Sequence, residues 1–187
     1  MSIDEVLLIA EEAMEKAVAH LASEFQKVRT GKASPTLVEN LVVEAYEGTS
    51  LKLRELASIT APEPRLIIIQ PWDSSTVEAI RRAIEEAGLG ITPTIDGKII
   101  RLPIPELSQE RREELVKIIR KMTEEQRIIV RHARRDALES LRKMQKEGLI
   151  TEDELAFAEK NVQKLTDKYI DKLDQTLSKK ESELLKV

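Results

Sequence analysis

The prolines divide this chain into three parts. All seven lie between Pro35 and Pro105, and the sequence outside that stretch contains none. Proline lacks an amide donor and clashes with the preceding helical turn, so it is excluded from helix interiors. The pattern predicts two helical arms, 1–30 and 106–187, around an inserted domain at 31–105. The arms can pack into one discontinuous bundle only if the insert brings its two ends close together.

The first arm predicts one long amphipathic helix. Apolar residues recur at steps of three or four, which is a near-heptad row: Ile3, Leu7, Ala10, Met14, Ala17, Leu21, Phe25 and Val28. Ser2 with Glu5 three residues later forms a capping box at its start. Gly31 is the expected stop, because glycine adopts the left-handed conformation easily. The glutamates on the other faces indicate a solvated surface.

The second arm predicts two more helices. The first runs from a Ser108 cap to Glu147, about 60 Å, with an apolar row interrupted by Gln126: Leu115, Ile118, Met122, Ile129, Ala133, Ala137, Leu141 and Met144. Gly148 ends it, and Thr151 with Glu154 caps the last helix. The row of that helix is Leu155, Ala158, Val162, Leu165, Tyr169, Leu173, Leu177 and Leu184. Helices this long predict an elongated, antiparallel three-helix bundle.

The insert predicts a small β/α/β domain, which makes the whole chain α+β. Leu66–Ile69 is a β-branched run typical of a buried strand, and Leu37–Tyr46 is also strand-like. Asp96-Gly97 between two β-rich runs predicts a hairpin. Ser75 with Glu78 predicts a capping box for a short helix that ends at Gly88. Trp72 is interpreted as a core anchor of the insert rather than a stacking platform.

Nothing in the sequence predicts an enzyme. It has no cysteine, no glycine-rich phosphate loop and no serine-centred elbow. His20 and His132 fall on different helices and are interpreted as surface residues, so we expect no catalytic residue, metal site or cofactor. No apolar run approaches the length of a membrane span. The acidic start, Met1–Glu5, differs from a secretory signal, and a cytoplasmic protein is expected.

Positive charge is concentrated in one segment. Residues 108–147 hold twelve Lys and Arg against eight Asp and Glu, a net charge of +4, in a chain whose net charge is −4. Arg120, Arg127, Arg131 and Arg134 are spaced so that they share a helix face, with Arg135, Arg142 and Lys146 in a neighbouring row. Two interpretations stay open. The arginines pair with acidic neighbouring helices, or they form a stripe that faces RNA phosphates.

Seven segments resemble the ribosome recycling factor family in order and spacing. They are Val28–Pro35, Leu56–Ile59, Pro71–Asp73, Ile100–Arg101 with Pro103 and Pro105, Glu110–Arg112, Arg131–Asp136 and Val162–Asp167. The resemblance covers the whole chain. It implies a three-helix bundle joined by two hinge strands to a small β/α/β domain, in an L shape similar to tRNA.

The resemblance also implies a function. A member of this family binds the post-termination ribosome and, with elongation factor G and GTP, splits it into subunits, which frees messenger RNA and deacylated tRNA. The positions that match the family's contacts with large-subunit ribosomal RNA are Arg29, Lys32, Arg131, Arg134 and Arg135. The matching hinge residues are Thr30, Gly31, Pro35, Pro103 and Pro105. We expect a monomer with these partners, no cofactor and no membrane association.

Two departures from the family pattern stand out. Lys32 takes the place of the usual arginine, and the segment Tyr46–Leu53 lacks the usual prolines. The alternative to a recycling factor is a structural helical-bundle adaptor without an RNA role, in which the arginines only pair with glutamates.

Overall fold

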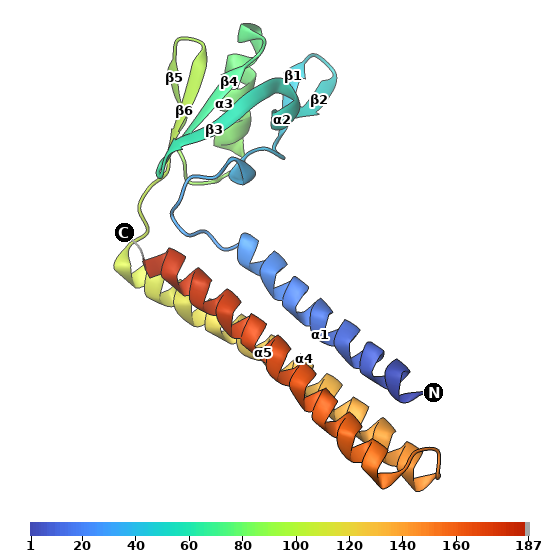
Figure 1. Cartoon of the computed structure of the whole chain (residues 1–187). Coiled ribbons are helices and arrows are strands. Elements are labelled where there is room, and N and C mark those ends of the chain that lie inside the picture. Colours follow the sequence, from blue (N-terminus) through green and yellow to red (C-terminus); the bar gives the residue numbers. More distant parts are fainter. Residues whose placement is uncertain (186–187) are drawn as a thin grey trace. The chain divides into compact units, whose positions relative to one another are not determined.

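The computed structural model describes residues 1–185 and divides into two compact units (Figure 1). One unit combines Met1–Arg29 with the chain from Gln109 onward, and the other is Thr30–Ser108. The first division falls one residue earlier than the sequence predicts, and the second falls three residues later. Each unit has its own core, and we describe each by itself.

The helical unit consists of α1 (Ile3–Gln26), α4 (Gln109–Lys146) and α5 (Glu152–Leu185). Each helix packs against both others. The buried row of α1 follows the predicted one from Ala10 to Phe25, with Val6 added at its start. Small residues such as Ala133 and Ala158 recur in the shared core, so the helices approach closely. No helix within residues 1–185 is both long enough and apolar enough to cross a membrane.

The helix ends explain where each helix begins and stops. The capping boxes predicted at Ser2 and Thr151 are confirmed, since each side chain accepts an amide three residues on and the glutamate there returns the contact. Gly148 adopts φ +74°, and the amides of Gly148 and Leu149 donate to the carbonyls of Gln145 and Met144. This is a Schellman motif, which only a left-handed residue allows.

Two predictions for the helices are wrong. Helix α1 ends at Gln26, five residues before Gly31, so Gly31 belongs to the connection and not to the helix end. In α4, Ile118 and Ile129 are exposed, and the buried row passes instead through Ile119, Thr123, Gln126 and Val130. Thr123 is tolerated inside because its hydroxyl donates to the Ile119 carbonyl at 2.8 Å.

Tyr169 joins α5 to α1 inside the bundle. It is 1% exposed, and its hydroxyl lies 2.8 Å from Glu11 Oε1 and 3.0 Å from Glu15 Oε1. Lys168 and Lys172 lie over its ring. Burial and the contacts with both carboxylates raise the pKa of Tyr169 far above its ordinary value. The phenol is therefore held as a neutral donor.

The insert contains a four-stranded antiparallel sheet in the order β3-β4-β6-β5 and a separate hairpin, β1-β2. Its elements follow the chain as η1 (Pro35–Leu37), β1 (Val42–Tyr46), β2 (Thr49–Lys52), α2 (Leu53–Leu56), β3 (Ala57–Glu63), β4 (Leu66–Pro71), η2 (Ser74–Thr76), α3 (Val77–Glu86), β5 (Thr94–Asp96) and β6 (Ile99–Pro103). The predicted turn at Asp96-Gly97 is confirmed by the β5–β6 pairing. The core gathers Ile67 and Ile69 of β4, Ile80 and Ile84 of α3, and Ile100 of β6.

Two further predictions for the insert are wrong. Trp72 is 69% exposed and is not a core anchor. Along β4 the residues Ile67, Ile69 and Pro71 point inward, so the alternation of the strand turns Trp72 outward. Ser75 does not cap α3, because Thr76 precedes that helix without a side-chain capping bond. Asp73 instead caps η2, and its carboxylate accepts both the amide and the hydroxyl of Ser75. These bonds and the Tyr46 hydroxyl lower the pKa of Asp73.

Candidate nucleic-acid interface

One side of α4 directs arginines toward α5. Arg120 contacts Glu181 at 2.5 Å, Arg127 contacts Asp174 at 2.6 Å and Arg142 contacts Glu159 at 3.0 Å. Arg120 and Arg127 are two turns apart on one face, whereas Arg142 reaches α5 from the neighbouring row that it was predicted to share with Arg135. Hydrogen bonding to Glu181 raises the pKa of Arg120. On this side the ion-pair interpretation is therefore right.

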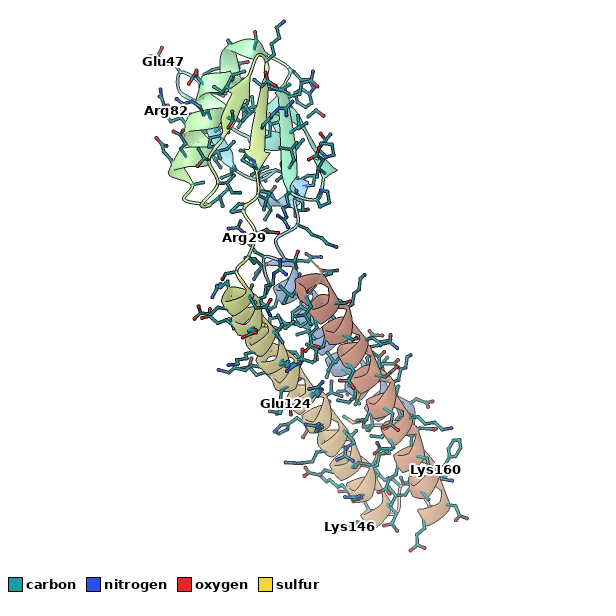
Figure 2. The ribbon with its side chains drawn as sticks, turned by 90° about the vertical axis from the view of Figure 1, so that its left-hand side faces the viewer. Arg29, Glu47, Arg82, Glu124, Lys146 and Lys160 are labelled. Atoms are coloured by element: carbon teal, nitrogen blue, oxygen red, sulfur yellow. The ribbon has the colours of Figure 1, made fainter. Side chains whose placement is uncertain are left out.

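The neighbouring side of α4 directs Arg131 and Arg135 into solvent. Both side chains are exposed, and Arg131 makes one ion pair, with Glu124 of its own helix at 3.0 Å. Figure 2 shows Glu124 on this helix. Hydrogen bonds from Arg127 and Arg131 lower the pKa of Glu124. Within residues 1–185, Arg135 has neither an ion pair nor a side-chain hydrogen bond. These guanidinium groups are open to an outside anion.

Arg134 lies between the two sides. Its Nη1 donates to Gln163 Oε1 of α5 at 3.2 Å, and its Nε is buried without a hydrogen-bond partner among the described residues. The predicted shared face of Arg120, Arg127, Arg131 and Arg134 is therefore split, because three of its four members reach toward α5. A buried donor without a partner lowers stability.

Arg29 and Lys32 belong to different units. Arg29 (Figure 2) follows α1 at the end of its segment of the helical unit, whereas Lys32 lies in the insert. Both residues are exposed. The five predicted contact residues are thus divided. Arg131, Arg134 and Arg135 come together within about one turn of α4, and the other two lie on the first connection between the units.

The predicted hinge residues differ in how tightly the insert holds them. Pro35 opens η1 and Pro103 ends β6, so both lie in regular structure. Thr30 and Gly31 precede the first element of the insert, and Pro105 follows its last strand. Gly31 adopts φ +79°, and a side chain there would meet Leu107 of the second connection at 3.5 Å. Gly31 is therefore required by its backbone conformation and not by space, because 3.5 Å is an ordinary van der Waals contact.

The turn between β3 and β4 holds both connections. The Ala33 amide donates to the Pro64 carbonyl at 2.7 Å, and the Ile104 amide donates to the Arg65 carbonyl at 2.8 Å. The Arg65 side chain pairs with Glu106. The sequence did not predict that the β3–β4 turn binds both connections, because Arg65 and Glu106 lie 41 positions apart and neither belongs to a recognisable motif.

The comparisons with known proteins agree with one another. The sequence model described as "Ribosome recycling factor" matches residues 21–185. Ribosome-recycling factors of Heliobacterium modesticaldum and Carboxydothermus hydrogenoformans are each 49% identical over 185 residues, covering 99% of this chain and all of theirs. The chain belongs to the ribosome recycling factor family.

Two solved structures of this family resemble the fold. One, a solution structure of the ribosome recycling factor, is 41% identical, with a TM-score of 0.76 over all of this chain and 99% of the other. The other is 39% identical, with a TM-score of 0.64 over the whole of both chains. It is described as models for the T. thermophilus ribosome recycling factor and the E. coli elongation factor G bound to the E. coli post-termination complex. The predicted fold class and the predicted family are both confirmed.

Proposed function

We propose that this chain binds the post-termination ribosome through the solvent-facing side of α4 and, with elongation factor G and GTP, separates its subunits. Arg131 and Arg135 make the central contacts with phosphates of large-subunit ribosomal RNA. Arg134, Arg29 and Lys32 extend the surface. The chain catalyses no reaction of its own, since GTP is hydrolysed by the elongation factor, and it acts in the cytoplasm.

The observation that carries this proposal is the pair of open guanidinium groups on the basic helix. Arg120, Arg127 and Arg142 are engaged by carboxylates of α5. A guanidinium that already holds a carboxylate must give it up before it binds a phosphate. Arg135 has no such contact within residues 1–185. Among these residues, Arg131 forms an ion pair only with Glu124, an exposed residue of its own helix that also pairs with Arg127. Planar guanidinium groups of this kind bind phosphate oxygens with two parallel hydrogen bonds. The T. thermophilus relative, which is described as bound to the post-termination complex, supports the same partner.

The test is co-sedimentation with ribosomes over a range of salt concentrations. The double variant Arg131→Ala with Arg135→Ala should bind about tenfold more weakly or worse, and its salt dependence should flatten by about two units because two phosphate contacts are lost. Its helical signal and melting temperature should match the wild type.

A matched control removes the same charge elsewhere in the bundle. Lys160→Ala with Lys164→Ala takes two exposed cations from α5, and Figure 2 shows the first of them. Only a small loss, from the change in net charge, is expected. If both double variants bind alike, the contact is not on the solvent-facing side of α4. If the wild type does not sediment with ribosomes at low salt, the adaptor alternative is right.

The two connections form the hinge of the proposed function. Because Ala33, Ile104 and Glu106 are each tied to the β3–β4 turn, the movable backbone is confined to about Val28–Lys32 and Leu107–Ser108. Thr30 and Gly31 lie in the first of these stretches. Pro35, Pro103 and Pro105 lie outside both and stiffen the edge of the insert. Two short pivots restrict the units to motion along an arc.

A further inference from the structure

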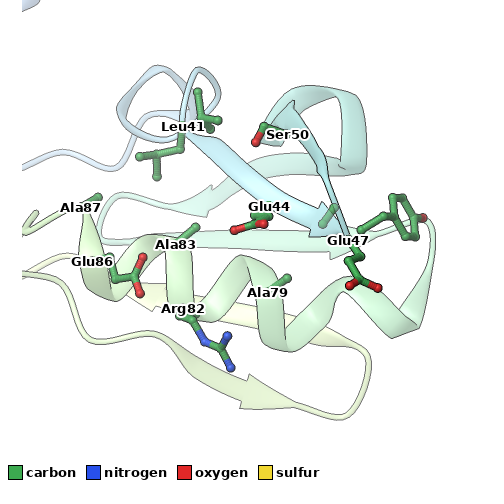
Figure 3. A pocket seen from close by; sticks show the side chains of 12 residues that line it. Leu41, Glu44, Glu47, Ser50, Ala79, Arg82, Ala83, Glu86 and Ala87 are labelled. Carbon is green, nitrogen blue, oxygen red and sulfur yellow. The ribbon is translucent and has the colours of Figure 1, made fainter.

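A groove of about 790 Å³ runs along the insert between β1 and α3 (Figure 3). Ala79 and Ala83 of α3, with Ala87 directly after it, line one side, and Val42, Glu44 and Tyr46 of β1 line the other. The small alanine side chains let α3 pack closely against β1, and the groove opens to solvent beside that contact. Val42 is 63% exposed and Tyr46 is 46% exposed, so the strand presents apolar surface to this space.

The groove carries unpaired negative charge. Glu44, Glu47 and Glu86 line it together with one cation, Arg82, which leaves a net charge of −2. Within residues 1–185 none of these four side chains forms an ion pair. The neighbouring Arg81 differs, because it holds both Glu78 and Glu85 outside the groove. A cationic side chain entering the groove would thus find carboxylates that have no competing partner.

The strand beside the groove has an open edge. In the described part of the chain β1 pairs with β2 alone, so its other edge has backbone groups without a strand partner. Such an edge accepts an extended segment as an added strand. Pairing with β1 of a second copy would set carboxylate against carboxylate, and that arrangement is unfavourable.

One exposed aromatic residue, Tyr46, lines the groove, and a second, Trp72, comes directly after the end of β4. Tyr46 lies in the groove, and its hydroxyl donates to Asp73 Oδ2 at 2.8 Å, which fixes the ring. Trp72, next in the chain to Asp73, is 69% exposed. Rigid tyrosine and tryptophan side chains are enriched among the residues that dominate protein interfaces. They supply apolar contact beside the charged groove.

We propose that this groove binds an extended lysine- or arginine-rich segment of a protein partner, which adds a strand to the open edge of β1. The inference deepens the proposed function, on which it rests, by assigning the insert a surface for a protein partner. RNA is excluded as the occupant by charge, since phosphates would meet three carboxylates. The bundle and the insert therefore recognise opposite charges.

The experiment uses the full chain and a nine-residue peptide of alternating lysine and threonine, with the glutamate–threonine peptide as a charge control. Trp72 is the one tryptophan of the chain and is next to Asp73, which the groove residue Tyr46 contacts, so its fluorescence reports on changes close to Tyr46. Backbone amide shifts in NMR then locate the contact. The cationic peptide should change Trp72 emission and shift the amides of Val42–Tyr46 and Ala79–Ala87, whereas the anionic peptide should do neither.

A pair of double variants separates the groove from general attraction to an acidic domain. Glu44→Gln with Glu86→Gln should weaken peptide binding about fivefold. Glu55→Gln with Glu63→Gln removes the same charge from the same unit outside the groove and should leave binding near the wild-type value. Equal loss in both, or amide shifts elsewhere, overturns the inference. If the peptide does not bind while the chain still sediments with ribosomes, the proposed role of the groove is wrong and the proposed role of α4 in ribosome binding stands.

Discussion

On the side of α4 that faces α5, arginines reach carboxylates 17 to 61 positions away in the chain, whereas on its solvent side Arg131 pairs only within the helix and Arg135 with nothing in residues 1–185. Both sides have the same residue type on the same helix. The difference lies in what stands opposite each arginine. Charge density alone therefore does not identify a binding surface, because partnered guanidinium groups hold helices together and open ones remain for ligands.

The largest effect on stability is expected from reversing the charge of an arginine on the side of α4 that faces α5. Arg127 is 21% exposed and contacts both Asp174 and Glu124. Partial burial opposes its charge, but these bonds outweigh it and raise its pKa. Arg127→Glu would place three carboxylates together, so the free energy of unfolding should fall by about 2 kcal/mol in urea denaturation. Adding Asp174→Arg should restore much of the loss.

Arg131→Glu is the control on the solvent side. It faces the same Glu124 but has room to turn into water, so its unfolding midpoint should stay close to that of the wild type while ribosome binding falls. If Arg127→Glu and Arg131→Glu destabilise equally, the two sides of α4 do not differ in the way described.

The chain offers the same comparison for its two tyrosines. Tyr169 is buried and lies within hydrogen-bond distance of two carboxylates, whereas Tyr46 is exposed and donates to Asp73. Tyr169→Phe should lower the free energy of unfolding by about 1.5 kcal/mol, since it removes a buried hydrogen bond to a charged group. Tyr46→Phe should shift the thermal midpoint less. If Tyr46→Phe lowers the thermal midpoint more than Tyr169→Phe does, the hydrogen bonds from Tyr169 to α1 add little to stability.

The Tyr169 prediction extends to alkaline pH. Its pKa in the fold is raised above the ordinary value of 10.0, first by burial and then by Glu11 and Glu15. The fold thus favours the protonated phenol, and this contribution is complete below about pH 10. It is lost as the pH rises from there toward the raised pKa. The wild type should lose stability over that range more steeply than Tyr169→Phe, measured by urea denaturation at each pH.

The sequence predicts most of the bundle, because its information is local. Apolar spacing, two capping pairs and Gly148 define these helices, and both capping pairs are present as expected. The predicted buried row of α4 is off by one position at Ile118 and Ile129, since Ile119 and Val130 are equally apolar neighbours. Only packing against α1 and α5 decides between them.

The sequence predicts the site less fully, because partners distant in sequence decide it. The spacing that puts Arg120, Arg127 and Arg134 near Arg131 says nothing of Glu181, Asp174 or Gln163 across the helix interface. The apolar character of tryptophan predicts a buried Trp72, but the alternation of β4 turns it outward. The groove between β1 and α3 depends on a sheet order that the sequence does not specify.

The smallest effect is expected from breaking exposed ion pairs within the insert, and two such pairs can be compared. Arg65 pairs with Glu106 across the β3–β4 turn and the exit segment, and Arg101 pairs with Asp96 within the β5–β6 hairpin. Both pairs are exposed, so neither should change the melting temperature measurably. Only the pair of Arg65 with Glu106 holds one of the two connections, the exit segment, against the insert.

The chain has no cysteine, so spin labels at Glu139→Cys and Lys98→Cys report the distance between the units by pulsed EPR. Glu106→Gln should broaden that distribution, because the exit segment is freed from Glu106 back to Ile104 and the second pivot lengthens. The charge swap Arg65→Glu with Glu106→Arg should narrow it again, and Arg101→Gln should leave it unchanged. An unaltered distribution in Glu106→Gln would place the pivot elsewhere, and equal broadening in Arg101→Gln would mean that loss of any exposed pair loosens the insert.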